Sequence, residues 1–121
     1  ATVSDAISCA IRRVCSILPV AVLVNYSESG SSTLRAARER PSVPILNLTP
    51  NLATARRLTV AWGVHSVVND RLRQVDEVCA TALEIAQAQG LAKRGDTVVI
   101  TTGVPFGQPG TTNSLRVETL L

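Results

Sequence analysis

Two polar, glycine-containing segments hold most of the residue types that could bind a ligand in this chain. Residues 27–33 read SESGSST and residues 101–113 read TTGVPFGQPGTTN, and each segment follows an apolar stretch. Backbone N–H groups at a helix start, together with serine and threonine hydroxyls, are typical of phosphate-binding loops in α/β proteins. Gly30 lets the backbone approach an anion closely, whereas the carboxylate of Glu28 opposes one. The two segments predict an anion site.

Each segment also has a structural interpretation. The serines of residues 27–33 are good helix caps, and capping alone would account for them. The glycines and prolines of residues 101–113 fit a wide turn that reverses the chain into an edge strand. The second segment could instead close over a ligand bound at the first. Because both segments follow strand-like stretches, an anion site is more credible for the two segments together than for either one alone.

No pattern of catalytic residues accompanies these segments. The sequence has no Walker lysine, no G-x-G-x-x-G and no G-x-S-x-G motif. His65 is the single histidine, and Cys9, Cys15 and Cys79 lack the close pairing with histidine that structural zinc requires. We predict no catalytic residue and no metal site within this chain. Reduced cysteines, with no signal peptide and no membrane-length apolar stretch, favour a cytoplasmic location.

Composition indicates one compact domain over residues 1–121. The chain is 45% apolar with one Trp, one Tyr and one Phe, so its core is built from Val, Leu, Ile and Ala. That composition suits parallel strands covered by helices. The net charge of +3 comes from scattered arginines rather than a basic cluster, which argues against nucleic-acid binding.

Apolar periodicity and breaker residues predict the elements that position the two segments. Helices are expected at residues 4–18, 31–40, from the Thr49-Pro50-Asn51 cap to Trp62, and at 74–89; strands are expected at 21–24, 45–48, 64–68, 97–100 and 114–120. Repeated strand–helix–strand units predict a three-layer α/β/α sandwich. The last connection has no helix, so the final strand is expected to be antiparallel.

The order of several short motifs resembles the C-terminal domain of pyruvate kinase, of bacterial type, over nearly the whole chain. The motifs are Ser29-Gly30, Arg40-Pro41, Pro44-Ile45, Ala55-Arg56-Arg57-Leu58, Trp62-Gly63-Val64, Gly95-Asp96, Val98-Val99-Ile100, Gly103-Val104-Pro105 and Gly110-Thr111-Thr112-Asn113. The resemblance implies a mixed five-stranded sheet of order 3-2-1-4-5. Strands 1 and 4 would then be neighbours, and the two polar segments would flank a topological switch point, where open α/β sheets bind ligands.

The resemblance also implies a role. In this family the C-terminal domain is regulatory and non-catalytic, and it contributes to a homotetramer. The catalytic site, with Mg²⁺ and K⁺, lies in a separate barrel domain of the same chain that converts phosphoenolpyruvate and ADP to pyruvate and ATP. By resemblance, a phosphorylated effector such as AMP or a sugar phosphate would be held by Ser27, Ser29, Gly30, Ser31, Ser32, Gly103, Gly107, Gly110 and Thr111. No cofactor, nucleic acid or membrane is implied for this domain.

Two other functions stay open from the sequence. The chain could be a structural oligomerisation module whose effector site is vestigial, or a free-standing protein that binds a phosphorylated metabolite. Glu28 leaves the identity of the effector open.

Overall fold

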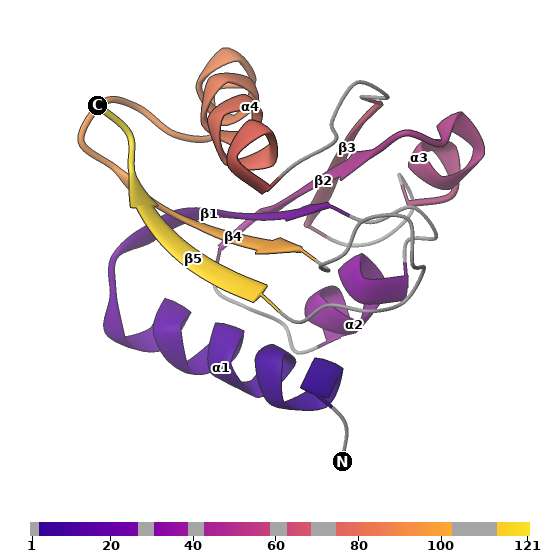
Figure 1. Cartoon of the computed structure of the whole chain (residues 1–121), viewed down its shortest axis with the longest axis horizontal. Helices are drawn as coiled ribbons and strands as arrows, with labels where there is room; N and C mark the ends of the chain where they lie inside the picture. The colour runs from indigo at the N-terminus through magenta and orange to yellow at the C-terminus, as the bar shows by residue number, and fades with distance from the viewer. Residues whose placement is uncertain (1–2, 27–30, 39–42, 59–62, 69–74, 103–113) are drawn as a thin grey trace.

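A computed structural model describes residues 3–26, 31–38, 43–58, 63–68, 75–102 and 114–121 (Figure 1). Helices and strands follow one another as α1 (Val3–Ile17), β1 (Val20–Tyr26), α2 (Ser31–Arg38), β2 (Ile45–Thr49), α3 (Leu52–Leu58), β3 (Val64–Val68), α4 (Val75–Ala88), β4 (Thr97–Thr102) and β5 (Ser114–Thr119). This order confirms the alternation that the periodicity predicts.

The strands form one sheet of order β3-β2-β1-β4-β5. Strands β1, β2, β3 and β4 run parallel to one another, and β5 pairs antiparallel with β4. Both the strand order and the antiparallel last strand confirm the predictions. Chain progression reverses between β1 and β4, which creates the expected switch point at their carboxyl ends.

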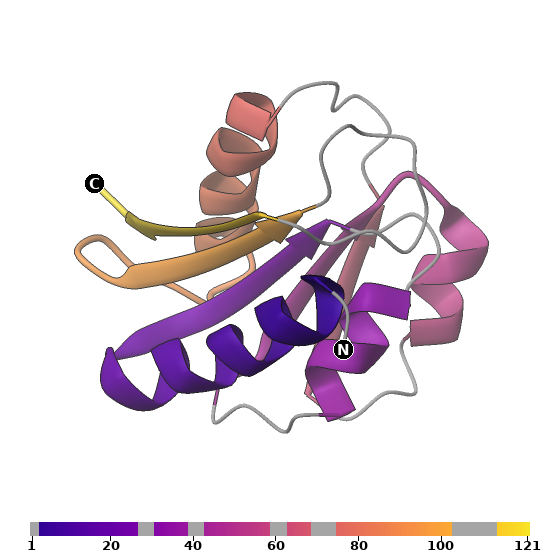
Figure 2. The same cartoon turned by 60° about the horizontal axis from the view of Figure 1, so that its bottom comes forward.

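Helices cover both faces of the sheet. Figures 1 and 2 show α1 and α2 on one side and α4 on the other. One apolar cluster joins the sheet to α1, α2 and α3 through Ile11, Ala36 and Leu58. The other joins the opposite face to α4 through Val78 and Ala82. The result is the three-layer α/β/α sandwich that was expected.

Breaker and capping residues set the ends of the helices. Pro19 follows α1, and Gly90 follows α4 with a φ of 74°, a left-handed conformation that favours glycine. Asn51 caps α3, because its Oδ1 accepts a hydrogen bond of 3.1 Å from the Thr54 N–H. The predicted extension of this helix to Trp62 passes beyond Leu58 into residues outside the described ranges.

One boundary prediction is wrong in an informative way. Thr101 and Thr102, expected at the start of a loop, belong to β4 and are 0% and 1% exposed. They pair with Leu115 and Ser114 of β5, and Thr101 also lies beside Asn25 of β1. Pairing on both sides extends the strand past its apolar residues, so these threonines are part of the sheet.

Candidate functional site

Buried polar side chains collect at the carboxyl edge of the sheet. Asn25 in β1, Asn47 in β2 and Thr101 in β4 lie near the ends of otherwise apolar strands, and each is at most 1% exposed. Thr33, in the first turn of α2, is also fully buried. Burying a polar group costs free energy unless it is hydrogen-bonded, so the cluster needs internal partners.

These four side chains form one hydrogen-bonded network. Thr33 Oγ1 lies 2.8 Å from Asn25 Oδ1 and 2.6 Å from Asn47 Oδ1. Asn25 Nδ2 donates to Thr101 Oγ1 at 2.7 Å, and Thr101 Oγ1 lies 3.5 Å from the carbonyl oxygen of Val24. The network therefore links α2 with three neighbouring strands.

The network has one consistent direction of donation. Thr33 has a single hydroxyl proton and cannot donate to two oxygens at once, while Asn47 Nδ2 is buried without a hydrogen-bond partner. Exchanging the oxygen and nitrogen of the Asn47 amide gives Thr33 one donor and one acceptor, and it leaves the Asn47 oxygen, in place of the nitrogen, buried without a hydrogen-bond partner. Asn47 then donates to Thr33, Thr33 to Asn25, Asn25 to Thr101, and Thr101 toward the Val24 carbonyl.

The network fixes the start of α2 above the strand ends. Thr33 is the third residue of this helix, after Ser31 and Ser32, and its hydroxyl holds the first turn to β1 and β2. The N-terminal turn of a helix has N–H groups without helical partners and a partial positive charge. The carboxyl edge at β1 and β2, beside the switch point between β1 and β4, therefore presents a helix start, as the sequence led us to expect.

Most of the predicted effector-binding residues cannot be placed. Ser31 and Ser32 open α2, although the positions of their side chains are not described. The other predicted residues lie outside the described ranges, and so does Glu28. They are Ser27, Ser29, Gly30, Gly103, Gly107, Gly110 and Thr111. Asn25 and Thr101 pair directly, so the two loops leave the sheet from neighbouring strands. The effector site itself stays a prediction.

Sequence reasoning missed the polar network beneath this edge. Its signal was present, because the apolar stretches of β1, β2 and β4 are each interrupted near the carboxyl end by Asn or Thr. The hydroxyl of Thr33 was grouped with the loop serines, whereas the structure buries it against the asparagines. Adjacent strands with polar residues at the same level would have indicated a network.

The remaining titratable candidates lie apart from this edge. His65 is exposed on β3, and Cys9 is exposed on α1. Cys15 is buried, and burial raises the pKa of its thiol, which keeps it protonated and unreactive. Within the described ranges, no three His, Cys, Asp or Glu side chains come together to hold a metal ion. Among the described helices, none has the length and apolar composition needed to cross a membrane.

Comparison with known proteins identifies the family. Residues 5–118 match the family described as "Pyruvate kinase, alpha/beta domain". This chain belongs to the pyruvate kinase alpha/beta domain family. The match runs from the first turn of α1 into β5, so it includes part or all of each helix and strand that the structure describes.

Individual relatives agree with this assignment. The chain is 43% identical over 116 residues to a pyruvate kinase of Methylorubrum extorquens, covering 96% of this chain and 24% of that protein. It is 38% identical over 119 residues to a pyruvate kinase of Geobacillus stearothermophilus, covering 98% of this chain and 20% of that protein. The chain thus spans about a quarter or less of the pyruvate kinases that it matches.

A solved structure shows the same fold. Cryptosporidium parvum pyruvate kinase, in complex with ADP, superposes with a TM-score of 0.89 at 25% identity. The superposition covers 100% of this chain and 24% of that one. The pyruvate kinase alpha/beta domain in this chain therefore keeps its architecture at low sequence identity.

Proposed function

We propose that this chain is the regulatory domain of a pyruvate kinase and binds a phosphorylated effector at the carboxyl edge between β1 and β4. The parent enzyme would transfer phosphate from phosphoenolpyruvate to ADP, with Mg²⁺ and K⁺ in a separate catalytic domain. Family membership supports this division of labour.

The observation that carries the proposal is the Thr33 network. It uses buried hydrogen bonds to hold the first turn of α2 directly above β1 and β2. A preorganised helix start binds an anion without first having to be ordered, because its N–H groups already point outward. The serines of residues 27–32, next to Thr33 in the sequence, would supply hydroxyl donors to such an anion.

Ligand titration tests this proposal. AMP, ribose 5-phosphate and fructose 1,6-bisphosphate are added separately to the ¹⁵N-labelled chain while amide chemical shifts are followed. We expect at least one ligand to shift the amides of α2 and the ends of β1 and β4. Replacing Ser29 and Ser32 with alanine should weaken that binding, and Ser16→Ala, on the exposed face of α1, is the matched control.

Two outcomes would overturn the effector assignment. One is the absence of shifts with all three ligands. The other is a set of shifts confined to α4, on the face of the sheet opposite to α2. A binding isotherm unchanged by the Ser29 and Ser32 substitutions would contradict the proposed residues but leave the location in place.

A second role, subunit assembly, is favoured by the free edge of the sheet. β5 is the last strand of the described sheet, and its Val117 is 45% exposed. Exposed edge strands are ready templates for pairing with another chain. We propose that β5 contributes to self-association, which sedimentation velocity over a range of protein concentrations measures directly. A chain that stays monomeric at every concentration would exclude this role.

A further inference from the structure

The solvent-facing side of α1 holds a pocket that the proposed functions above do not use. Its volume is about 360 Å³, and the described residues that line it are Cys9, Arg12, Arg13 and Ser16. Binding sites for small molecules occupy roughly 300–1,000 Å³ in proteins, so this pocket lies at the lower end of that range. It has room for a small organic molecule.

The four lining residues share one side of the helix because of their spacing. Positions i, i+3, i+4 and i+7 fall on the same helical face, and the lining residues from Cys9 to Ser16 follow this spacing. All four are exposed. Ile11 and Cys15 are 3% and 7% exposed and pack in the apolar cluster beneath α1. The lining residues therefore take no part in the apolar core.

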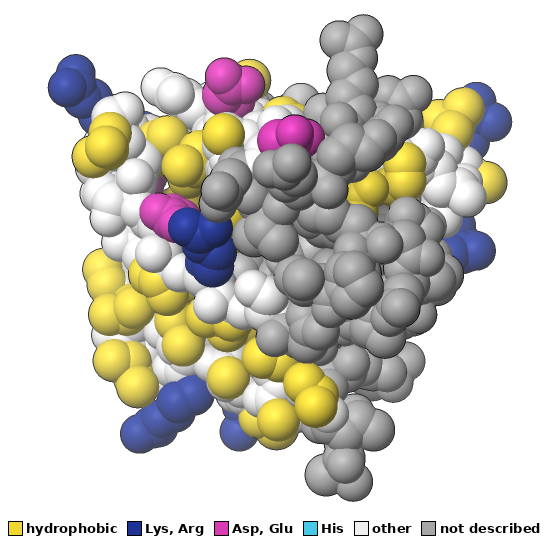
Figure 3. All heavy atoms as spheres, viewed as in Figure 1, with side chains coloured by type: hydrophobic (Ala, Val, Ile, Leu, Met, Phe, Trp, Pro, Cys, Tyr) yellow, Lys and Arg dark blue, Asp and Glu magenta, His cyan; other side chains and the backbone are white. Residues whose placement is uncertain are grey.

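The pocket is positively charged. Arg12 and Arg13 each bring a guanidinium, and the described lining residues include no Asp or Glu. Asp5, one turn before Cys9, is the single acidic residue of α1, and the two positive charges exceed its negative one. Figure 3 shows basic side chains projecting beyond α1 at the lower edge of the molecule, while the acidic side chains visible in that view lie in its upper half. The pocket favours an anion.

The position of the pocket along α1 distinguishes carboxylates from phosphate. Phosphate sites use the unpaired N–H groups at the start of a helix. Cys9 is well beyond the first turn of α1, which begins at Val3, so the N–H groups beside the pocket already donate to carbonyls one turn earlier. The donors that remain are those of the two arginines. A planar guanidinium matches a planar carboxylate through two parallel hydrogen bonds, so two arginines match two carboxylates.

The other two lining side chains bring no charge that opposes an anion. Ser16 Oγ donates its proton to the Arg13 carbonyl oxygen at 2.7 Å, so this hydroxyl has no second proton to offer a carboxylate. Cys9 adds a small, weakly polar side chain that reagents can reach. Anion binding therefore depends on the two arginines, and Cys9 serves as a chemical marker of the pocket.

We propose that this pocket binds a small aliphatic dicarboxylate, with one carboxylate at Arg12 and the other at Arg13. The site differs from the proposed effector site in its chemistry. The start of α2 suits phosphate because of its N–H groups, whereas the middle of α1 offers guanidinium groups. The inference goes beyond the regulatory role proposed above and does not depend on it.

Protection of Cys9 from alkylation tests the site. Iodoacetamide, an uncharged reagent, is added to the folded chain at fixed pH and ionic strength, and labelling is followed by intact mass and peptide mapping. Cys9 is exposed whereas Cys15 and Cys79 are buried, so the first label reports on Cys9. At a succinate concentration about ten times its dissociation constant, we expect labelling to slow by roughly tenfold, because only the empty pocket reacts. Acetate, with one carboxylate, should give little protection.

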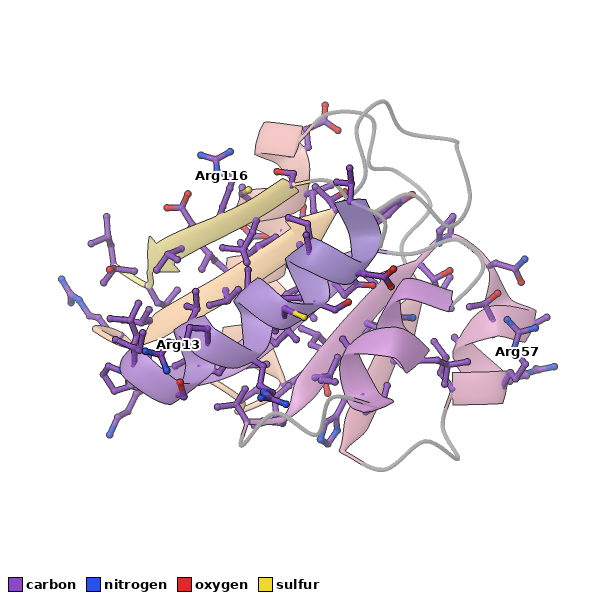
Figure 4. All side chains as sticks on the ribbon, turned by 90° about the horizontal axis from the view of Figure 1, so that it is seen from below. Arg13, Arg57 and Arg116 are labelled. Atoms are coloured by element: carbon purple, nitrogen blue, oxygen red, sulfur yellow. The ribbon has the colours of Figure 1, made fainter. Side chains whose placement is uncertain are left out.

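Arginine variants assign the protection to the two guanidinium groups. Arg12→Gln and Arg13→Gln each remove one charge, and we expect either change to weaken succinate binding by about tenfold or more, since hydrogen bonds to charged groups are strong. Arg57→Gln is the matched control, because Arg57 is exposed on α3 and Figure 4 shows it far from Arg13. Rates with and without succinate are compared within each variant, so a change in the reactivity of Cys9 itself cancels.

Amide chemical shifts give a second measurement that does not depend on the thiol. Succinate added to the ¹⁵N-labelled chain should shift the amides of Cys9, Arg12 and Arg13, and the same spectra show whether each variant is folded. Shifts confined to α2 and the ends of β1 and β4 would place succinate at the proposed effector site and overturn the inference.

Three labelling results would also overturn it. Labelling that succinate leaves unchanged, or that acetate slows equally, would exclude a dicarboxylate site. Inorganic phosphate that protects Cys9 better than succinate would contradict the class of ligand. Protection that survives both Arg12→Gln and Arg13→Gln would exclude the arginines. Each of these results leaves the effector proposal standing, because that proposal is measured at α2.

Discussion

At the scale of single residues, Thr33 is the side chain on which the polar network depends. Its hydroxyl is the only group that contacts both Asn25 and Asn47 among the described hydrogen bonds. Thr33→Val keeps the shape but leaves both buried amides without that partner. We expect the free energy of unfolding, measured by urea denaturation, to fall by about 2–3 kcal/mol, because unsatisfied buried polar groups are costly.

Thr33→Ser is the matched control for this prediction. Serine keeps the hydroxyl and removes only a methyl group, so its cost should stay near 1 kcal/mol. Equal losses for valine and serine would show that packing of the methyl group, and not the hydroxyl, makes Thr33 important.

Cys15 gives a pH dependence whose sign follows from its burial. Burial raises the pKa of this thiol above its ordinary value of 9.0. The folded state therefore holds the proton more tightly than the unfolded state, and the resulting stability is complete below pH 9 and is lost as pH rises through the folded pKa. Urea denaturation between pH 7 and pH 10.5 measures the loss. Cys15→Ala should flatten this alkaline decline, and an unchanged slope would exclude Cys15 as its source.

The residue scale is also where sequence reasoning reached its limit. Serine, threonine and glycine types predicted where polar groups gather, but not which of them are buried. Thr33 and Thr101 have the same side chain as loop threonines, and only the pairing of β1 with β2 and β4 determines that they face Asn25 and not solvent. Contacts between residues 76 positions apart, such as Asn25 and Thr101, leave no local periodicity to read.

At the scale of elements, local signals predicted nearly the whole fold. Continuous apolar stretches gave β1 and β4, because strands buried on both faces need them. Alternation of apolar and polar residues gave β5, at the edge of the sheet. The ends of α1 and α4 could be predicted from Pro19 and Gly90. Proline cannot continue a helix, and glycine adopts the left-handed conformation that ends one. Strand lengths were harder to predict, because pairing with neighbouring strands extends β4 through Thr101 and Thr102.

The cap of α3 provides the prediction at this scale. Asn51 accepts from Thr54 N–H at 3.1 Å, and α3 is only 7 residues long, so one lost cap affects a large part of the helix. We expect Asn51→Ala to lower the free energy of unfolding by about 1 kcal/mol. Asn51→Asp, which keeps an acceptor oxygen, should remain near the unmodified value in the same thermal or urea denaturation. A neutral alanine variant would show that the rest of the fold holds α3 without its cap.

At the scale of the whole molecule, β4 connects the candidate effector site to the free edge. Thr101 of β4 pairs with Asn25 on one side and with Leu115 of β5 on the other. Asn25 in turn contacts Thr33 at the start of α2, and Leu115 belongs to the strand proposed to pair with a second copy. A row of hydrogen-bonded or directly opposite residues therefore runs across the sheet from one proposed binding region to the other.

This arrangement predicts that effector binding and self-association are thermodynamically linked. A ligand that favours the dimer must bind the dimer more tightly by the same factor by which it strengthens dimerisation, and typical couplings are about 5–150-fold.

The first measurement is sedimentation velocity with and without the phosphorylated ligand that shifts α2. The second is calorimetric titration of that ligand at protein concentrations below and above the dimer dissociation constant. Val117→Lys, which places a charge on the exposed edge strand, is the control, because a chain that stays monomeric should bind the ligand with one affinity at both concentrations. If the unmodified chain also shows one affinity while its dimerisation responds to ligand, the two measurements report different binding events, because one event would have to obey the reciprocal relation. If neither quantity changes, the row of residues through β4 holds the sheet together without transmitting the binding event.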